Sequence, residues 1–81
     1  MKASDLEKAV KLARTRAQNV AMRDRLAAYE TLTLSIGDGG KVSEIVMSVS
    51  WVEDVRRALI ADFNRHIEAN DKALAELGVT P

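Results

Sequence analysis

Few side chains in this 81-residue sequence could do chemistry, and those that could are polar residues on otherwise apolar helix faces. The only histidine, His66, lies among the apolar residues of the last segment, where it could act as a general base or contact a ligand. Arg56 and Asn70 lie on the same stripe, and Asp24 lies on the extended stripe of the first segment. If these four residues converge, they would form a polar pocket at a subunit boundary.

A structural interpretation of these polar residues stays open beside the functional one. Polar side chains on a core face commonly set the register or the oligomeric state of helical bundles. A single histidine on such a face usually packs its ring and makes one hydrogen bond. The sequence alone does not show whether the four residues meet.

No set of residues indicates catalysis or a metal centre. The chain has no cysteine and one histidine, so it offers neither a Cys-based zinc site nor a histidine cluster. The run from Gly37 to Gly40 lacks the spacing of a phosphate-binding loop and lies between two predicted strands. We therefore predict that the protein is not an enzyme and carries no cofactor or metal.

Charge is balanced overall but is divided between the two ends of the chain. Twelve basic and twelve acidic residues cancel, yet residues 1–30 hold seven bases and four acids, while residues 51–81 hold four bases and six acids. This division favours pairing of one helix with the other, within or between protomers. Arg23 and Arg25 add candidate anion-binding groups to the first helix. The bases surround that helix without interleaved aromatic residues, which makes nucleic-acid binding the weaker interpretation.

The first element that must position these residues is a helix over about 4–29. Ser4 and Glu7 have the spacing of a capping box, in which each side chain satisfies a backbone N–H of the first turn. The first apolar face repeats at helical spacing and comprises Leu6, Val10, Ala13, Ala17 and Val20. A second face follows with Met22, Leu26 and Tyr29. Ala9, Ala13, Ala17 and Ala21 form a ladder of small residues that favours close approach of another helix.

The middle of the chain, over about 31–49, predicts a β-hairpin. Apolar residues alternate with Thr and Ser from Thr31 to Ile36, as in a half-buried strand. Asp38 and Gly39 supply the positive φ values that a tight turn needs. The returning strand starts at Lys41, and its register is open because apolar residues fall on both faces, so a bulge near Ser43 is one alternative.

The last element is a helix over about 51–77. Ser50 and Glu53 repeat the capping-box spacing, and Gly78 suits the left-handed position that follows a helix. Its wide apolar stripe comprises Val52, Val55, Leu59, Ile60, Phe63, Ile67, Leu74 and Leu77. The chain is therefore predicted to be one α+β domain over 1–81 with the order helix, β-hairpin, helix.

The lengths of these elements predict a homo-oligomer. Helices of this size would be about 40 Å long, whereas a six-residue strand spans about 20 Å, so one hairpin cannot cover two helices. A lone two-stranded hairpin is marginally stable and its edges invite pairing. The expected remedy is a twofold dimer in which hairpins join into a four-stranded sheet or helices form an antiparallel bundle.

The chain is predicted to stay in the cytoplasm. No apolar run approaches the roughly 20 residues that span a membrane. The first residues, Met-Lys-Ala-Ser-Asp, precede no apolar core of a signal peptide.

The layout of capped helix, Asp-Gly hairpin and long final helix ending in Leu-Ala-Glu-Leu-Gly-Val (residues 74–79) resembles small accessory proteins of tailed-phage genomes. Some phage proteins of this size are oligomers that counter host defences by blocking a protein or by sequestering a nucleotide signal. The resemblance implies a host-cytoplasmic protein with a ligand at a subunit boundary lined by arginines.

The sequence thus predicts a non-catalytic homo-oligomer that holds a small anionic ligand, such as a nucleotide, between subunits. The candidate ligand-binding residues are Arg56, His66, Asn70, Asp24, Arg23 and Arg25. The alternative is a protein–protein interaction module, either an adaptor or an inhibitor. A weak nucleic-acid binder is the second alternative.

Overall fold

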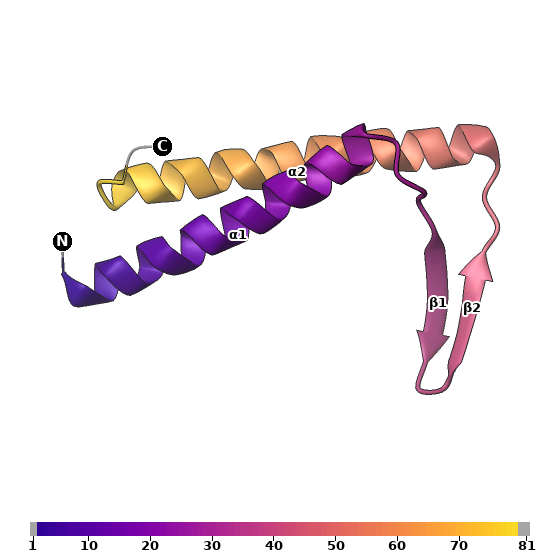
Figure 1. Ribbon diagram of the computed structural model, residues 1–81, viewed down its shortest axis with the longest axis horizontal. Coiled ribbons are helices and arrows are strands. Elements are labelled where there is room, and N and C mark those ends of the chain that lie inside the picture. The colour runs from indigo at the N-terminus through magenta and orange to yellow at the C-terminus, as the bar shows by residue number, and fades with distance from the viewer. Residues whose placement is uncertain (1, 80–81) are drawn as a thin grey trace.

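Two long antiparallel helices carry a β-hairpin that projects from one end of the pair in the computed structural model, which describes residues 2–79 (Figure 1). The elements are α1 (Ala3–Ala27), β1 (Leu34–Asp38), β2 (Lys41–Ile45) and α2 (Val49–Glu76). This order confirms the predicted helix–hairpin–helix fold. We call residues 31–48, the hairpin with its two connecting segments, the arm. Neither strand of the arm packs against either helix, and no described helix is long and apolar enough to cross a membrane.

Both predicted capping boxes are wrong in detail, because both helices begin earlier than predicted. The N-cap of α1 is Lys2, which makes no side-chain cap, so Ser4 lies inside the helix. The N-cap of α2 is Ser48, whose hydroxyl accepts a hydrogen bond from the backbone N–H of Trp51 at 3.2 Å. Two serines stand two residues apart here, and Ser48 has the extended backbone that an N-cap needs.

Both helices end in the same hydrogen-bonded motif. At the end of α2, Gly78 has φ +85°, and the N–H groups of Gly78 and Val79 donate to the carbonyls of Ala75 and Leu74. This is the left-handed termination predicted at Gly78. At the end of α1, Tyr29 takes the corresponding position with φ +60°, a conformation that a side chain makes unfavourable. The first helix therefore ends at Ala27 rather than near residue 29.

The hairpin has one continuous register. Leu34 pairs with Ile45, and Ile36 pairs with Ser43, so there is no bulge at Ser43. The turn is Gly39-Gly40, and Gly39 has φ +64°. Asp38 is the last residue of β1 and pairs with Lys41, so Gly-Gly rather than Asp-Gly forms the turn. The strands are shorter than the predicted 31–49 because the segments next to the helices lie outside the ladder.

The core is a seam between α1 and α2. In α1 the seam repeats every three or four residues, and every other α1 residue except Val20 is exposed. The seam residues of α1 are Asp5, Ala9, Leu12, Arg16, Asn19, Arg23 and Leu26. The facing series in α2 is Glu53, Arg56, Ile60, Phe63, Ile67, Asn70 and Leu74. Both series have the seven-residue repeat of an antiparallel coiled coil.

The seam overturns the predicted packing face of α1. The predicted stripe is displaced from the seam by one residue, and Leu6 is 58% exposed. Of the alanine ladder, Ala9 is buried, whereas Ala13, Ala17 and Ala21 are exposed and no helix of this chain covers them. The sequence pattern followed the apolar side chains, but the structure packs a mixed polar and apolar series instead.

Candidate functional site

The middle of the seam is polar. The Arg16 guanidinium forms an ion pair with Asp71, and Asn19 Nδ2 donates to Asn70 Oδ1 at 2.9 Å. One turn further along, Arg23 Nη1 donates to Asn64 Oδ1 at 3.2 Å. Each helix contributes to these contacts, so only one alignment of α1 against α2 satisfies them. The polar layers thus fix register at the expense of apolar burial.

Replacing the Asn19–Asn70 pair with apolar residues should raise the stability of the helix pair and remove one of the contacts that fix the alignment of α1 against α2. We expect the double variant Asn19→Leu/Asn70→Leu to raise the melting temperature by about 5 °C or more, because leucine fills such seam positions. The single variant Asn70→Leu should lower the melting temperature, because it leaves the Asn19 amide without its partner. Circular dichroism at fixed chain concentration measures both. A double variant that melts below the unaltered protein would show that the amide pair is not a specificity device.

The most buried charged group is the guanidinium of Arg56, whose residue is 6% exposed. Its Nη1 donates to the Leu26 carbonyl and its Nη2 to the Glu30 carbonyl, each at 3.0 Å. The last carbonyls of a helix lack the usual donor four residues on and carry partial negative charge, and the Leu26 carbonyl accepts from Arg56 in addition to the Tyr29 N–H at 3.1 Å. Arg56 therefore caps the end of α1 from α2, and it joins the two helices at the base of the arm.

The surroundings of Arg56 form a small junction. The Tyr29 ring centroid lies 5.3 Å from the Arg56 Cζ, within the range of a cation–π contact. Glu53 Oε1 lies 4.0 Å from Arg56 Nε, which has no hydrogen-bond partner among the described residues. Tyr29 thus has an unfavourable positive φ and also places its ring over the buried Arg56 guanidinium. We define the Arg56 junction as Arg56, Tyr29 and the carbonyls of Leu26 and Glu30.

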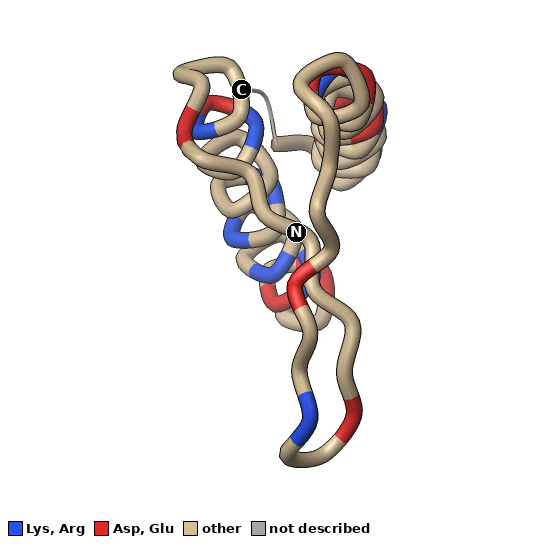
Figure 2. Tube along the Cα trace, turned by 90° about the vertical axis from the view of Figure 1, so that its right-hand side faces the viewer, with Lys and Arg blue, Asp and Glu red and all other residues tan. Residues whose placement is uncertain are grey.

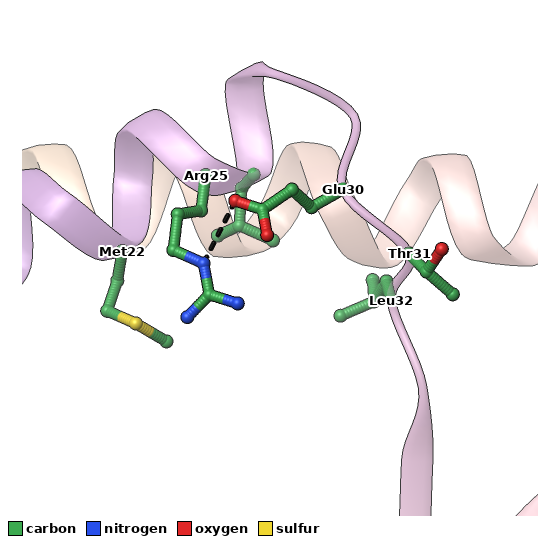
Figure 3. Close-up of a pocket in the computed structure, with 6 residues that line it drawn as sticks. Met22, Arg25, Glu30, Thr31 and Leu32 are labelled. Atoms are coloured by element: carbon green, nitrogen blue, oxygen red, sulfur yellow. Dashed lines mark hydrogen bonds and ion pairs between the residues drawn. The ribbon is translucent and has the colours of Figure 1, made fainter.

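Beside this junction lies a shallow hollow lined by residues of α1 and the start of the arm (Figure 3). Its volume is about 120 Å³, below the roughly 300 Å³ of small-molecule pockets. Arg25 Nε donates to Glu30 Oε2 at 2.9 Å across it. This hydrogen bond lowers the pKa of the Glu30 carboxyl and raises the pKa of Arg25. The stabilisation by this exposed pair is therefore present at neutral pH and is lost as the pH falls through the lowered pKa of Glu30.

The six predicted ligand-binding residues do not meet in one chain. Arg56 and Asn70 both lie in the seam, but fourteen residues of α2 separate them by about 21 Å. Arg23 bonds Asn64 and the exposed Asp24, while Arg25 bonds Glu30.

His66 does not lie in the seam, where the sequence pattern placed it. Its side chain is 62% exposed, and its Nε2 lies 3.7 Å from Asp62 Oδ2. Asp62 accepts a hydrogen bond from Arg65 that lowers the pKa of its carboxyl. These groups form an exposed charged surface on the outer side of α2.

The sequence pattern did not reveal the partners of the buried polar groups. Asn19 and Asp71 were overlooked because each lies off the apolar faces that periodicity picks out, and Tyr29 was placed on an apolar face without Arg56 as its partner. A search for the seven-residue repeat without regard to polarity would have found Asn19. No local signal in the sequence marks the Leu26 and Glu30 carbonyls as acceptors.

Large apolar side chains are exposed on the arm and at its base. Ile36 is 66% exposed and Val42 is 70% exposed, on opposite faces of the hairpin. Val46 and Val49, between β2 and the first turn of α2, are also exposed. A second exposed apolar set, Leu6 and Val10, lies near the other end of the helix pair.

Among residues 2–79, no three His, Asp or Glu side chains are grouped so that they could hold a metal ion. The arm and the stripe of α1 present apolar side chains without an intramolecular partner, which is what a protein-docking surface requires. No family model, curated protein or solved structure matches this chain.

Proposed function

We propose that this chain is a non-catalytic protein-interaction module that acts as a homo-oligomer, with the helix pair as a rigid stem and the arm as its main docking surface. The observation that carries the proposal is the exposure of apolar residues on both faces of an arm whose strands touch neither helix. Two strands alone are marginally stable in water, so the arm needs a partner to remain ordered.

The small core of the stem supports the same proposal. Only Ala9, Leu26, Ile67 and Leu74 are buried apolar residues among those described, and the centre of the seam is polar. A chain of this size gains only a few kcal/mol from such a core. Covering the arm and the Leu6–Val10 surface with a second copy would supply the missing apolar burial.

Light scattering coupled to size-exclusion chromatography tests this function. We expect the purified chain to have the mass of a dimer or higher oligomer at micromolar concentration, with amide protection along both strands. A chain that stays monomeric up to millimolar concentration would contradict the proposal, and protected strand amides in that monomer would show that the arm is ordered without a partner.

A second candidate function is the sequestration of a small anionic ligand, such as a nucleotide signal, by a phage-encoded oligomer. Lys8 and Lys11 favour it, because neither has a carboxylate within 4.0 Å among the described residues. Both line an open groove of about 420 Å³, within the size range of ligand sites, and the rest of its lining is Leu12, Ala73, Leu77 and one carboxylate, Glu76. Native mass spectrometry of the purified oligomer would show stoichiometric extra mass if such a ligand is retained.

A further inference from the structure

The two edges of the arm differ in charge. In β2, Lys41 and Glu44 place charges along the strand, and charged residues are a common protection of edge strands against pairing. In contrast, residues 31–37 carry no charge at all, and Thr, Leu, Ser and Ile fill the segment up to Gly37. In Figure 2 the β1 strand has no coloured position until the red Asp38 at the tip of the arm, whereas β2 has one blue and one red position. The β1 edge is thus the unprotected one.

The register of the hairpin decides which backbone groups are free at each edge. Asp38 and Lys41 flank the two-residue turn and therefore form a hydrogen-bonded pair. Because hydrogen-bonded and non-hydrogen-bonded pairs alternate, the N–H and C=O groups of Ser35 and Gly37 point away from β2. On the opposite edge, the same groups of Glu44 point away from β1.

The β1 edge is complementary to itself. If two β1 strands pair antiparallel about a twofold axis at Ser35, the free backbone groups of each Ser35 bond those of the other. Leu34 then lies opposite Ile36 of the second copy, twice by symmetry, in the closely spaced type of pair. Leu34, Ile36 and Ile45 share one face of the hairpin, so the two copies would form one apolar face from six side chains. Centring the axis on Gly37, the other residue of β1 with free backbone groups, would place Ile36 opposite Asp38 of the second copy.

We propose that β1 is the pairing edge of the arm and that its occupant is β1 of a second copy, which makes a four-stranded antiparallel sheet. This inference rests on the proposed self-association and specifies its interface. It also accounts for the different composition of the two strands, since β2 becomes the charged outer edge of the joined sheet.

Proline substitutions on the two edges test the inference, because Ser35 and Glu44 are paired with each other in the hairpin. Ser35→Pro removes an N–H that the hairpin does not use, and Glu44→Pro removes the equivalent N–H on the other edge. We expect Ser35→Pro to raise the dimer dissociation constant about 100-fold or more, since both central hydrogen bonds are lost. Glu44→Pro should leave it within a few-fold of the unaltered protein. Sedimentation equilibrium measures the constants, and circular dichroism checks that the helices persist.

Cysteine variants give a second readout that does not depend on proline tolerance. The chain has no cysteine, so Ser35→Cys introduces a single thiol. Hydrogen-bonded pairs in antiparallel strands have Cα atoms about 5.5 Å apart, within the range of a disulfide. Ser35→Cys should therefore form a covalent dimer on mild oxidation, whereas Glu44→Cys should not.

The possible outcomes separate this inference from the proposed function. If Glu44→Pro dissociates the dimer and Glu44→Cys forms the cross-link, β2 is the pairing edge and the inference is wrong. Dimers that survive both proline variants without cross-linking at Ser35 would show that the helices carry the assembly, and self-association would stand without the sheet. A monomeric unaltered protein would overturn both proposals.

Discussion

Arg56→Ala is expected to destabilise the protein by about 3 kcal/mol or more. The substitution removes the two hydrogen bonds that a buried guanidinium donates to the Leu26 and Glu30 carbonyls, and each hydrogen bond from a charged group contributes about 1.5–3 kcal/mol. A domain of this length has a total stability of only about 4–12 kcal/mol. The melting temperature should therefore fall by about 15 °C at fixed chain concentration.

The neighbouring Arg57 provides a matched control for this prediction. Its side chain is 78% exposed and lies 3.6 Å from Asp54 Oδ1 on the helix surface. Arg57→Ala removes the same atoms from the same helix, yet it should change the stability by no more than about 0.5 kcal/mol.

Arg56→Lys should fall between these two results, because an ammonium lacks the planar fork that reaches two carbonyls at once. Thermal and urea unfolding followed by circular dichroism measure all three variants. If Arg56→Ala melts within 2 °C of Arg57→Ala, the guanidinium does not cap α1.

The order of the helices and strands could be predicted from local sequence patterns, and the structure confirms that order. The change from helical to alternating periodicity near Thr31 and the three glycines at 37, 39 and 40 place the hairpin correctly. Gly78 ends α2 as predicted, since glycine accepts a positive φ without strain. The same motif at Tyr29 was not predictable, because a tyrosine there conflicts with local preference and is held by contacts with a distant Arg56.

The packing face of α1 could not be predicted from hydrophobicity. Leu6 and Val10 belong to the most apolar face, yet the seam uses Arg16, Asn19 and Arg23 one residue away. These polar residues enter the seam only because Asp71, Asn70 and Asn64 stand opposite them, and such pairing depends on residues more than forty positions away. The apolar face that the seam does not use stays exposed, and under the proposed self-association it is available to a second copy.

The candidate site shows the same limit. Arg56 and Asn70 were predicted to lie on an inward stripe, and they do lie in the seam. His66 was placed there by the same reasoning, but its side chain is 62% exposed, whereas every apolar residue of the predicted α2 stripe is buried or half-buried. Whether a polar residue on an apolar stripe is buried depends on where the facing helix crosses it. The sequence of one helix alone does not determine that crossing point.

Gly37→Ala is expected to disrupt the hairpin while leaving the helix pair folded. A Cβ at Gly37 would overlap the Lys41 carbonyl oxygen and lie 2.7 Å from Val42 Cα, and both are backbone atoms that cannot rotate away. Overpacking of this kind costs about 1–3 kcal/mol, which is enough to unfold a marginally stable pair of strands. Amide exchange should show loss of protection at Leu34, Ile36 and Asp38.

Gly40→Ala is the control for the disruption caused by Gly37→Ala, because Gly40 has no positive φ and an added Cβ would meet nothing within 4 Å. Both variants should keep the helical circular dichroism of the stem, since neither strand packs against α1 or α2. If the arm holds the copies together, Gly37→Ala should also lower the mass of the oligomer, and Gly40→Ala should not. A Gly37→Ala protein with full strand protection would show that β2 can shift away from β1, and the close approach at Gly37 would then not fix the hairpin.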